Sequence, residues 1–132
     1  MKLLAADIGN TNVSIGLFTD DRLARSWRAI TRANATADEV AAMLTGLLAL
    51  DGHTLGELDA VALASVVPPL TETWERLSAD RIGVAPAIVD AGSLDGVLDI
   101  RIDRPSEAGA DRLANALAAN SSTTRSLPTV RV

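Results

Sequence analysis

Hydrophobic residues near the start of the chain fall into short runs that predict strands. Residues 3–6 and 13–18 are mainly apolar and a polar stretch separates them, which predicts a β-hairpin with its tight turn at residues 7–12. Asp20-Asp21 marks a second turn, and residues 23–29 then alternate between apolar and polar positions. We therefore predict that a three-stranded antiparallel meander opens the fold.

The spacing of hydrophobic positions becomes helical after residue 36. Thr36 and Glu39 have the spacing of a capping box, which marks the start of a helix, and Asp51-Gly52 ends it. The apolar positions at helical spacing between these signals are Val40, Leu44, Leu47 and Leu48. His53 follows with no second metal ligand nearby, so we predict a solvated loop residue there.

Later segments predict strands that alternate with helices. Residues 59–67 are small and β-branched apolar residues, as expected of a strand buried on both faces. Pro68-Pro69 ends that strand and suits the first turn of a helix, in which Leu70, Trp74 and Leu77 form the buried stripe. Trp74 is therefore predicted to be a core residue.

The second half of the chain continues the same alternation. Residues 84–89 and 97–102 are predicted strands, a helix begins near Pro105, and residues 127–132 begin another strand. This order predicts an α/β fold in which the crossovers are long enough for parallel strand pairing. Without a repeat or a long linker, residues 1–132 are expected to form a single domain.

Composition and charge exclude several classes of function. Of the 132 residues, 48% are hydrophobic, which indicates a globular chain rather than a disordered one. The net charge of -5 argues against nucleic-acid binding. Cysteine is absent, which is compatible with the cytoplasm. Neither a signal peptide nor a membrane span is expected, since no apolar run approaches bilayer length.

The predicted hairpin turn has residues suited to binding phosphate. Gly9 permits positive φ and close backbone approach, while Asn10, Thr11 and Asn12 have short polar side chains. Successive N–H groups in such a turn form an anion site, and a carboxylate such as Asp7 can hold Mg²⁺ directly or through water. Taken alone, the segment slightly favours an ordinary hairpin turn, because Asn and Gly are common in turns.

A second candidate site lies at the start of the last predicted helix. Gly109 would cost about 1 kcal/mol relative to Ala in a helix, so it is expected to serve close approach to the backbone. Asp111 could accept a proton from a substrate hydroxyl while Arg112 holds a substrate anion. A charged pair on a solvated helix face is the alternative, and it is favoured when this segment is considered alone.

Three segments together resemble the type III pantothenate kinases. Residues 7–12 resemble the first phosphate motif of that family, residues 65–70 its central strand-to-helix junction, and residues 109–112 its substrate and catalytic motif. The order and intervals match over roughly residues 1–120. The resemblance implies the architecture of the acetate and sugar kinase/Hsp70/actin superfamily, in which two RNase H-like α/β halves enclose a nucleotide cleft.

The resemblance also implies an activity and its cofactors. Family members transfer the γ-phosphoryl group of ATP to the 4′-hydroxyl of pantothenate, the first step of coenzyme A synthesis. They act as dimers and need Mg²⁺ and a monovalent cation, K⁺ or NH₄⁺. The expected partners are therefore pantothenate and a second copy of the chain.

The family's roles can be carried onto matching positions of this sequence. Asp7 becomes the carboxylate nearest the metal. The residues assigned to ATP are Asp7, Ile8, Gly9, Asn10, Thr11, Asn12 and Val13. Those assigned to pantothenate are Gly109, Ala110, Asp111 and Arg112, with Asp111 as the general base.

The sequence departs from the family pattern in two ways. Family members commonly have Tyr and then Asn before the last motif, whereas Ile102 and Arg104 stand here, so the affinity for pantothenate or the identity of the substrate is expected to change. The family also continues into a second acidic motif and a C-terminal half, and residues 127–132 resemble only the beginning of that strand. We expect an N-terminal half with little activity alone, and self-association through its exposed apolar surface.

Two alternatives to a pantothenate kinase remain. The first is a non-enzymatic nucleotide-binding or regulatory module that keeps half of the kinase fold. The second is a kinase of the same superfamily acting on a sugar or acetate, which residues 109–112 disfavour because they match the pantothenate enzymes.

Overall fold

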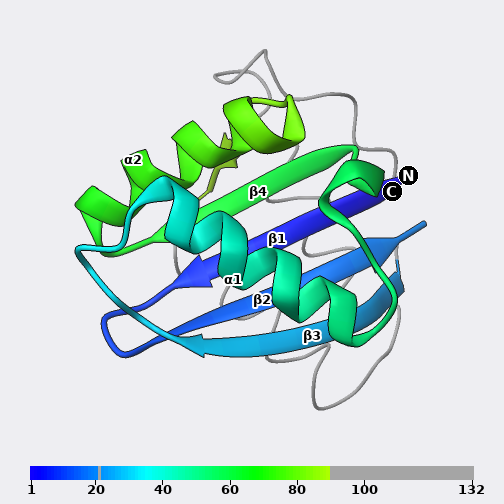
Figure 1. Ribbon diagram of the computed structural model, residues 1–132, viewed down its shortest axis with the longest axis horizontal. Coiled ribbons are helices and arrows are strands. Elements are labelled where there is room, and N and C mark those ends of the chain that lie inside the picture. Colours follow the sequence, from blue (N-terminus) through cyan, green and yellow to red (C-terminus); the bar gives the residue numbers. More distant parts are fainter. Residues whose placement is uncertain (21, 90–132) are drawn as a thin grey trace.

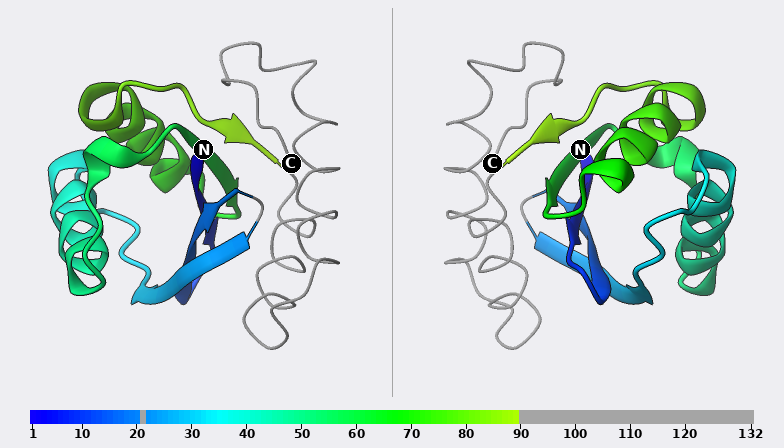
Figure 2. Two further views of the ribbon diagram at one scale, coloured as in Figure 1. Left: turned by 90° about the vertical axis from the view of Figure 1, so that its right-hand side faces the viewer. Right: turned by 90° about the vertical axis from the view of Figure 1, so that its left-hand side faces the viewer.

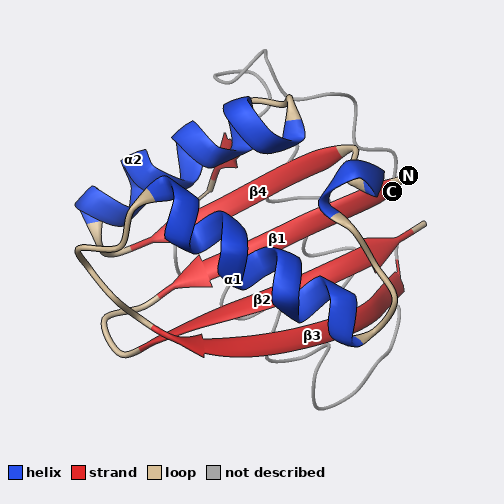
Figure 3. Ribbon diagram, in the orientation of Figure 1, coloured by secondary structure: helices blue, strands red, loops and turns tan. Residues whose placement is uncertain are grey.

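The computed structural model describes residues 1–20 and 22–89, and in this part of the chain five strands form one mixed sheet (Figure 1). The strands are β1 (Lys2–Ile8), β2 (Asn12–Thr19), β3 (Arg22–Ile30), β4 (Ala60–Ser65) and β5 (Ala87–Ile88), and the helices are α1 (Ala37–Leu50) and α2 (Pro68–Leu77). The strand order is β3-β2-β1-β4-β5, with β1 antiparallel to β2 and parallel to β4. The predicted order of three strands, helix, strand, helix, strand is confirmed (Figure 3).

The two helices cover the same face of the sheet (Figure 2). Alternate residues of β1 therefore enter different cores. Leu4 and Ile8 pack in the cluster that includes residues of α1 and α2, whereas Leu3 and Ala5 belong to a second cluster on the opposite face. β1 is buried on both faces, and in the described strand order it lies in the middle of the sheet, between β2 and β4.

The first helix begins and ends where the sequence predicts. The hydroxyl of Thr36 accepts a hydrogen bond from the Glu39 N–H at 3.1 Å, and the Thr36 N–H donates to the Glu39 carboxylate at 3.0 Å, which completes the capping box. At the other end, Gly52 follows the helix with φ of 80°. Three of the four predicted apolar positions are buried and the fourth, Leu47, is half-buried against the core.

The capping box makes stability depend on pH through Glu39. The pKa of Glu39 lies below its ordinary value of 4.5, chiefly because the backbone N–H of Thr36 donates to the carboxylate. The unfolded chain therefore takes up this proton more readily, so the contribution of Glu39 is present above pH 4.5 and is lost as the pH falls through the lowered pKa. We expect Glu39→Gln to be less stable than wild type near neutral pH, with a difference that shrinks between about pH 5 and pH 3. Urea unfolding across this range would contradict the prediction if the difference stayed constant.

The structure confirms the second helix and shortens the strand before it. The helix starts at Pro68 and buries Leu70, Trp74 and Leu77. The preceding strand ends at Ser65, two residues earlier than predicted, because the Ser65 hydroxyl accepts a hydrogen bond from the Val67 N–H at 3.0 Å and turns the chain. The junction between β4 and α2 is therefore a short turn closed by its own serine.

The last described strand is much shorter than predicted. The prediction covered residues 84–89, but β5 contains only Ala87–Ile88. A π-helical turn (Ser78–Ile82) follows α2, and the Ser78 carbonyl accepts hydrogen bonds from the N–H groups of Gly83 and Val84. Val84 is thereby removed from strand pairing, and Pro86 has no N–H to donate. The predicted strands at residues 97–102 and 127–132 and the predicted helix from Pro105 lie outside the described residues.

Candidate functional site

Two of the three motifs meet at one edge of the sheet. Because β1 and β4 are parallel, their carboxyl ends lie side by side, and Ile8 is in register with Ser65. The Val66 N–H also donates to the Ile8 carbonyl at 3.1 Å. The hairpin loop (residues 9–11, between β1 and β2) is therefore adjacent to the β4–α2 junction (Figure 1). Carboxyl ends of parallel strands are where α/β folds commonly bind ligands.

The hairpin loop is held by three hydrogen bonds. The Gly9 N–H donates to the Asn12 carbonyl at 2.9 Å. The Thr31 N–H donates to the Thr11 carbonyl at 2.9 Å, and the Thr31 hydroxyl donates to the Gly9 carbonyl at 2.7 Å. Within the described residues, the N–H groups of Asn10 and Thr11 donate to no backbone carbonyl. These exposed donors can therefore serve an anion.

The structure explains why a glycine stands at position 9: the backbone approaches closely there, and its φ is not positive. Among the described glycines only Gly52 and Gly83 have positive φ, so the predicted use of Gly9 in that conformation is wrong. A Cβ at Gly9 would lie 3.1 Å from the Asn12 carbonyl oxygen, the same oxygen that accepts the Gly9 N–H. The predicted close approach is thus confirmed.

We expect Gly9→Ala to disturb the hairpin loop, because the added methyl group pushes the Asn12 carbonyl away from its donor. The expected result is a loss of unfolding free energy of about 1 kcal/mol, the net value of one hydrogen bond, with faster hydrogen exchange at the residue 9 N–H. Gly46→Ala is the matched control, since a Cβ at Gly46 meets no atom within 4 Å on an exposed part of α1. It should instead stabilise the chain by about 0.5–1 kcal/mol. Equal effects of the two substitutions would contradict this account.

Two of the residues assigned to ATP are core residues. Ile8 is 0% exposed and Val13 is 3% exposed, and both pack in the helix-facing cluster. Any contact that these two residues make with a phosphate must therefore come from their backbone. This geometry is compatible with the predicted cradle, in which N–H groups rather than side chains hold the anion.

Asp7 occupies the opposite face of β1. Side chains alternate along a strand, so Asp7 points to the face that contains Leu3 and Ala5, away from α1 and α2. The residue is half-buried and lies between Ala64 of β4 and Ser14 of β2. No group of three or more potential metal ligands occurs among the described residues. A single carboxylate beside a phosphate site nevertheless fits Mg²⁺, which commonly uses one or two carboxylates together with substrate phosphates and water.

The predicted pantothenate site lies outside the described residues. This applies to Gly109, Ala110, Asp111 and Arg112, and also to the departures at Ile102 and Arg104. Their roles stay predictions.

A cavity that the sequence did not predict opens on the helix-facing side of the same edge. It has a volume of about 350 Å³ and lies between α1, α2 and the neighbouring ends of β2 and β3. Its lining residues are Val13, Ile30, Arg32, Ala35, Glu39, Val40, Ala42, Met43, Leu70 and Trp74. They come from separate parts of the chain, so no local pattern could reveal the cavity. The lining is mostly apolar, which distinguishes it from the polar hairpin loop.

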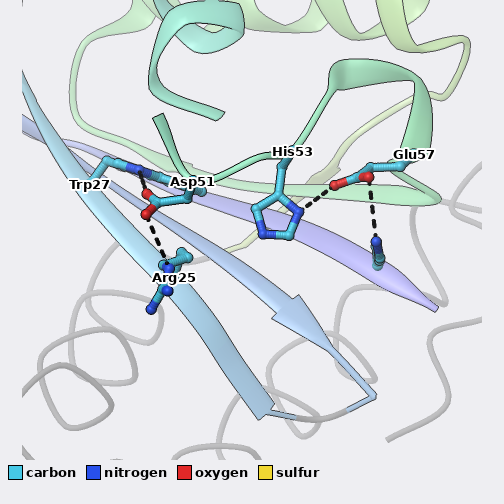
Figure 4. Close-up of polar contacts among 6 residues, drawn as sticks. Arg25, Trp27, Asp51, His53 and Glu57 are labelled. Atoms are coloured by element: carbon cyan, nitrogen blue, oxygen red, sulfur yellow. Dashed lines mark hydrogen bonds and ion pairs between the residues drawn. The ribbon is translucent and has the colours of Figure 1, made fainter. Parts of the chain in front are cut away.

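A polar cluster lies near the start of β1, at the end of the strand opposite the hairpin loop (Figure 4). His53 Nδ1 is 2.6 Å from Glu57 Oε1, and Lys2 Nζ is 3.4 Å from the other carboxylate oxygen of Glu57. Partial burial alone would raise the pKa of Glu57, but the hydrogen bond with His53 and the charge of Lys2 outweigh it and lower the pKa. His53 lies in a loop, as predicted, but its side chain is half-buried rather than fully solvated, because a short 3₁₀ turn (Leu55–Glu57) brings a carboxylate against the ring.

A second carboxylate near this cluster fastens α1 to the edge strand. Asp51, at the end of the helix, accepts a hydrogen bond from Trp27 Nε1 at 2.8 Å and pairs with Arg25 Nε at 3.2 Å. Both partners belong to β3. These contacts support the fold at a distance from the candidate phosphate site.

Similarity to solved structures identifies the class of fold. The structure of YeaZ from Pseudomonas aeruginosa matches with a TM-score of 0.56 at 20% identity, covering 77% of this chain and 49% of that chain. The Lmo2764 protein from Listeria monocytogenes matches with a TM-score of 0.50 at 14% identity, covering 76% of this chain and 38% of that chain. The fold is therefore the predicted RNase H-like α/β fold. None of the described helices is long and apolar enough to cross a membrane.

Sequence similarity then identifies the family. A profile of the type III pantothenate kinases matches residues 3–131. The type III pantothenate kinase of Dehalococcoides mccartyi is 48% identical over 118 residues, which are 89% of this chain and 44% of that protein. This chain belongs to the type III pantothenate kinase family, which confirms the resemblance. It spans less than half the length of the curated relatives that it matches.

Proposed function

We propose that this chain is the part of a type III pantothenate kinase that binds Mg·ATP and presents the general base to pantothenate. The observation that carries the proposal is the hairpin loop, in which the N–H groups of the exposed residues Asn10 and Thr11 donate to no described backbone carbonyl and lie two and three residues after the end of the strand that contains Asp7. Family membership supports pantothenate as the substrate and phosphoryl transfer from ATP as the reaction.

In the proposed reaction, the protein positions ATP and pantothenate and neutralises the negative charge of the phosphates. N–H groups of the hairpin loop hold phosphate oxygens of ATP, and the Asp7 carboxylate faces the metal. The Asp111 carboxylate accepts the proton of the pantothenate 4′-hydroxyl, whose oxygen forms a bond to the γ-phosphorus while the bond from that phosphorus to the β–γ bridging oxygen breaks. Arg112, with Gly109 and Ala110, holds pantothenate. Mg²⁺, when bound, neutralises negative charge on the phosphates.

The proposal also covers the domain organisation of the enzyme, its monovalent cation, its oligomeric state and its location. Residues 1–132 act as one RNase H-like half of a kinase with two halves, since the curated relatives are more than twice as long. A monovalent cation, K⁺ or NH₄⁺, assists the reaction, the enzyme is a homodimer, and it acts in the cytoplasm without a nucleic-acid or membrane partner. Light scattering across a wide concentration range tests the dimer, and a strictly monomeric species would overturn that part.

A coupled assay with ATP, Mg²⁺, K⁺ and pantothenate tests the activity. The isolated chain should turn over far more slowly than a full-length family member, because one half of a closed nucleotide cleft excludes water poorly. Turnover comparable with a full-length enzyme would contradict the assignment of this chain to one half. Calorimetric titration with Mg·ATP tests the binding function separately, and absence of binding would overturn it.

Replacing Asp111 with Asn tests the general base. In an active enzyme that contains this chain, we expect kcat to fall by about 10²–10⁴-fold with little change in ATP affinity, because a general base acts in the transition state. Unchanged kcat would remove Asp111 from this role.

The alternative is a non-enzymatic nucleotide-binding module. In such a module the hairpin loop would bind nucleotide without a phosphoryl transfer. Mg·ATP binding without phosphopantothenate formation, even when the remaining half is supplied in trans, would support the module over the kinase.

A further inference from the structure

We propose that Thr31 is a positioning residue for the nucleotide-binding loop, an inference that rests on the proposed function. Thr31 directly follows β3, far from the hairpin loop in sequence. Its hydroxyl nevertheless donates to the Gly9 carbonyl at 2.7 Å, and its N–H donates to the Thr11 carbonyl at 2.9 Å. One residue thus fastens the loop at two of its three positions.

These bonds set the direction in which the loop presents its donors. The described residues contain no cis peptide bond. In a trans peptide, the carbonyl oxygen and the following N–H point in opposite directions. Because the Gly9 carbonyl points to the Thr31 hydroxyl, the Asn10 N–H points away from Thr31. Asn10 is exposed and its N–H donates to no backbone carbonyl of the described residues, so this donor is turned outward.

Thr31 is itself held firmly enough to orient the loop. The preceding residue, Ile30, is in register with Asn12 at the end of the β2–β3 ladder. On the other side, the Arg32 carbonyl accepts a hydrogen bond from the Ala35 N–H at 3.0 Å, just before the capping box of α1 begins. The half-buried Thr31 side chain therefore projects from a segment fixed at both ends.

The proposed role depends on the Thr31 hydroxyl and not on the rest of the side chain, so two substitutions can test it. Thr31→Val keeps the branched shape and the backbone N–H bond to Thr11 but removes the donor to Gly9. Thr31→Ser keeps the donor. A structural role alone would change the melting temperature without changing nucleotide affinity at temperatures where the protein is folded. A positioning role requires the affinity itself to change.

The experiment measures the Kd of the 132-residue chain for Mg·ATP by calorimetry, together with hydrogen exchange at the Asn10 N–H. We expect Thr31→Val to raise the Kd by about three- to tenfold and to speed exchange, and Thr31→Ser to restore both to within about twofold, from the net value of one hydrogen bond. Thr45→Val is the matched control, since the Thr45 hydroxyl donates to the Ala41 carbonyl at 2.8 Å within α1, away from the loop. Its Kd should equal that of wild type.

The outcomes separate this inference from the proposed function. A wild-type chain that does not bind Mg·ATP overturns both. Binding by wild type with an equal Kd for Thr31→Val overturns the role of Thr31 alone, as does a Thr45→Val effect of the same size. Should Thr31→Val fail to fold, Thr31→Ala removes the same hydroxyl with less steric demand, and it must then show the raised Kd.

Discussion

Replacing Asp7 with Asn is expected to weaken Mg·ATP binding by about ten- to a hundredfold, the equivalent of about 1.5–3 kcal/mol for an interaction with a charged group. Asn is nearly isosteric with Asp, so β1 should keep its pairing with β2 and β4. The lost charge removes the only contribution that we assign to the metal from this strand. Calorimetric titration with ATP, in Mg²⁺ and then in a chelator, measures the effect.

The dependence on the metal distinguishes this role from a general loss of affinity. In chelator, Asp7→Asn should bind ATP at least as tightly as wild type, because the carboxylate attracts ATP only through Mg²⁺ and repels the phosphates without it. Asp80→Asn is a control of the same chemistry at an exposed position in the turn after α2. A variant at Asp7 with unchanged Mg²⁺ dependence would show that this carboxylate does not face the metal.

Replacing Trp74 with Ala should have the largest effect on stability. Trp74 is 1% exposed and is among the largest fully buried side chains, and it also lines the cavity between α1 and α2. Its truncation enlarges that cavity, and large-to-small substitutions of this kind cost about 3–5 kcal/mol. A loss of this size approaches the whole stability of a small domain, about 5–15 kcal/mol. Urea unfolding followed by circular dichroism measures it.

An exposed apolar residue provides the control for Trp74. Leu50 ends α1 and is 75% exposed, so Leu50→Ala should change stability by no more than about 0.5 kcal/mol. If Trp74→Ala cost less than about 1 kcal/mol, the interface between α2 and the sheet would be more weakly packed than its burial indicates.

Local signals in the sequence predicted most of the described fold. The capping box at Thr36 and Glu39 and the prolines at the start of α2 act within one helical turn, so the residues themselves contain the information. The meander was predictable for the same reason, since its strands are joined by short turns. What the sequence could not give was the central position of β1, because its parallel pairing with β4 joins distant segments.

The wrong predictions come from contacts between residues that are close in sequence but form no pattern that predicts them. The strand predicted at residues 84–89 contains only two residues, because the Ser78 carbonyl accepts hydrogen bonds from the Gly83 and Val84 N–H groups after a π-helical turn. His53 was expected in solvent, but its ring forms a hydrogen bond with the carboxylate of Glu57, four residues later. Gly9 is needed for a close contact with a carbonyl rather than for an unusual φ.

The candidate site was predicted in part. The residues of the hairpin loop were recognisable from their turn chemistry, and their family role came from the resemblance. The contribution of Thr31 could not be seen, because a threonine after a strand has no distinctive signal and its partners, Gly9 and Thr11, lie in a distant part of the sequence. The role of Asp111 as the general base stays a prediction, since Asp111 lies outside the described residues.

The strand order has a consequence for synthesis on the ribosome. β1 leaves the exit tunnel first and finds β2 at once, yet its other neighbour, β4, is complete only roughly sixty residues later. At translation rates of about 5–20 residues per second, the second edge of this apolar strand stays unpaired for about 3–12 seconds. During that interval the nascent chain offers a natural substrate for chaperones that bind extended hydrophobic segments.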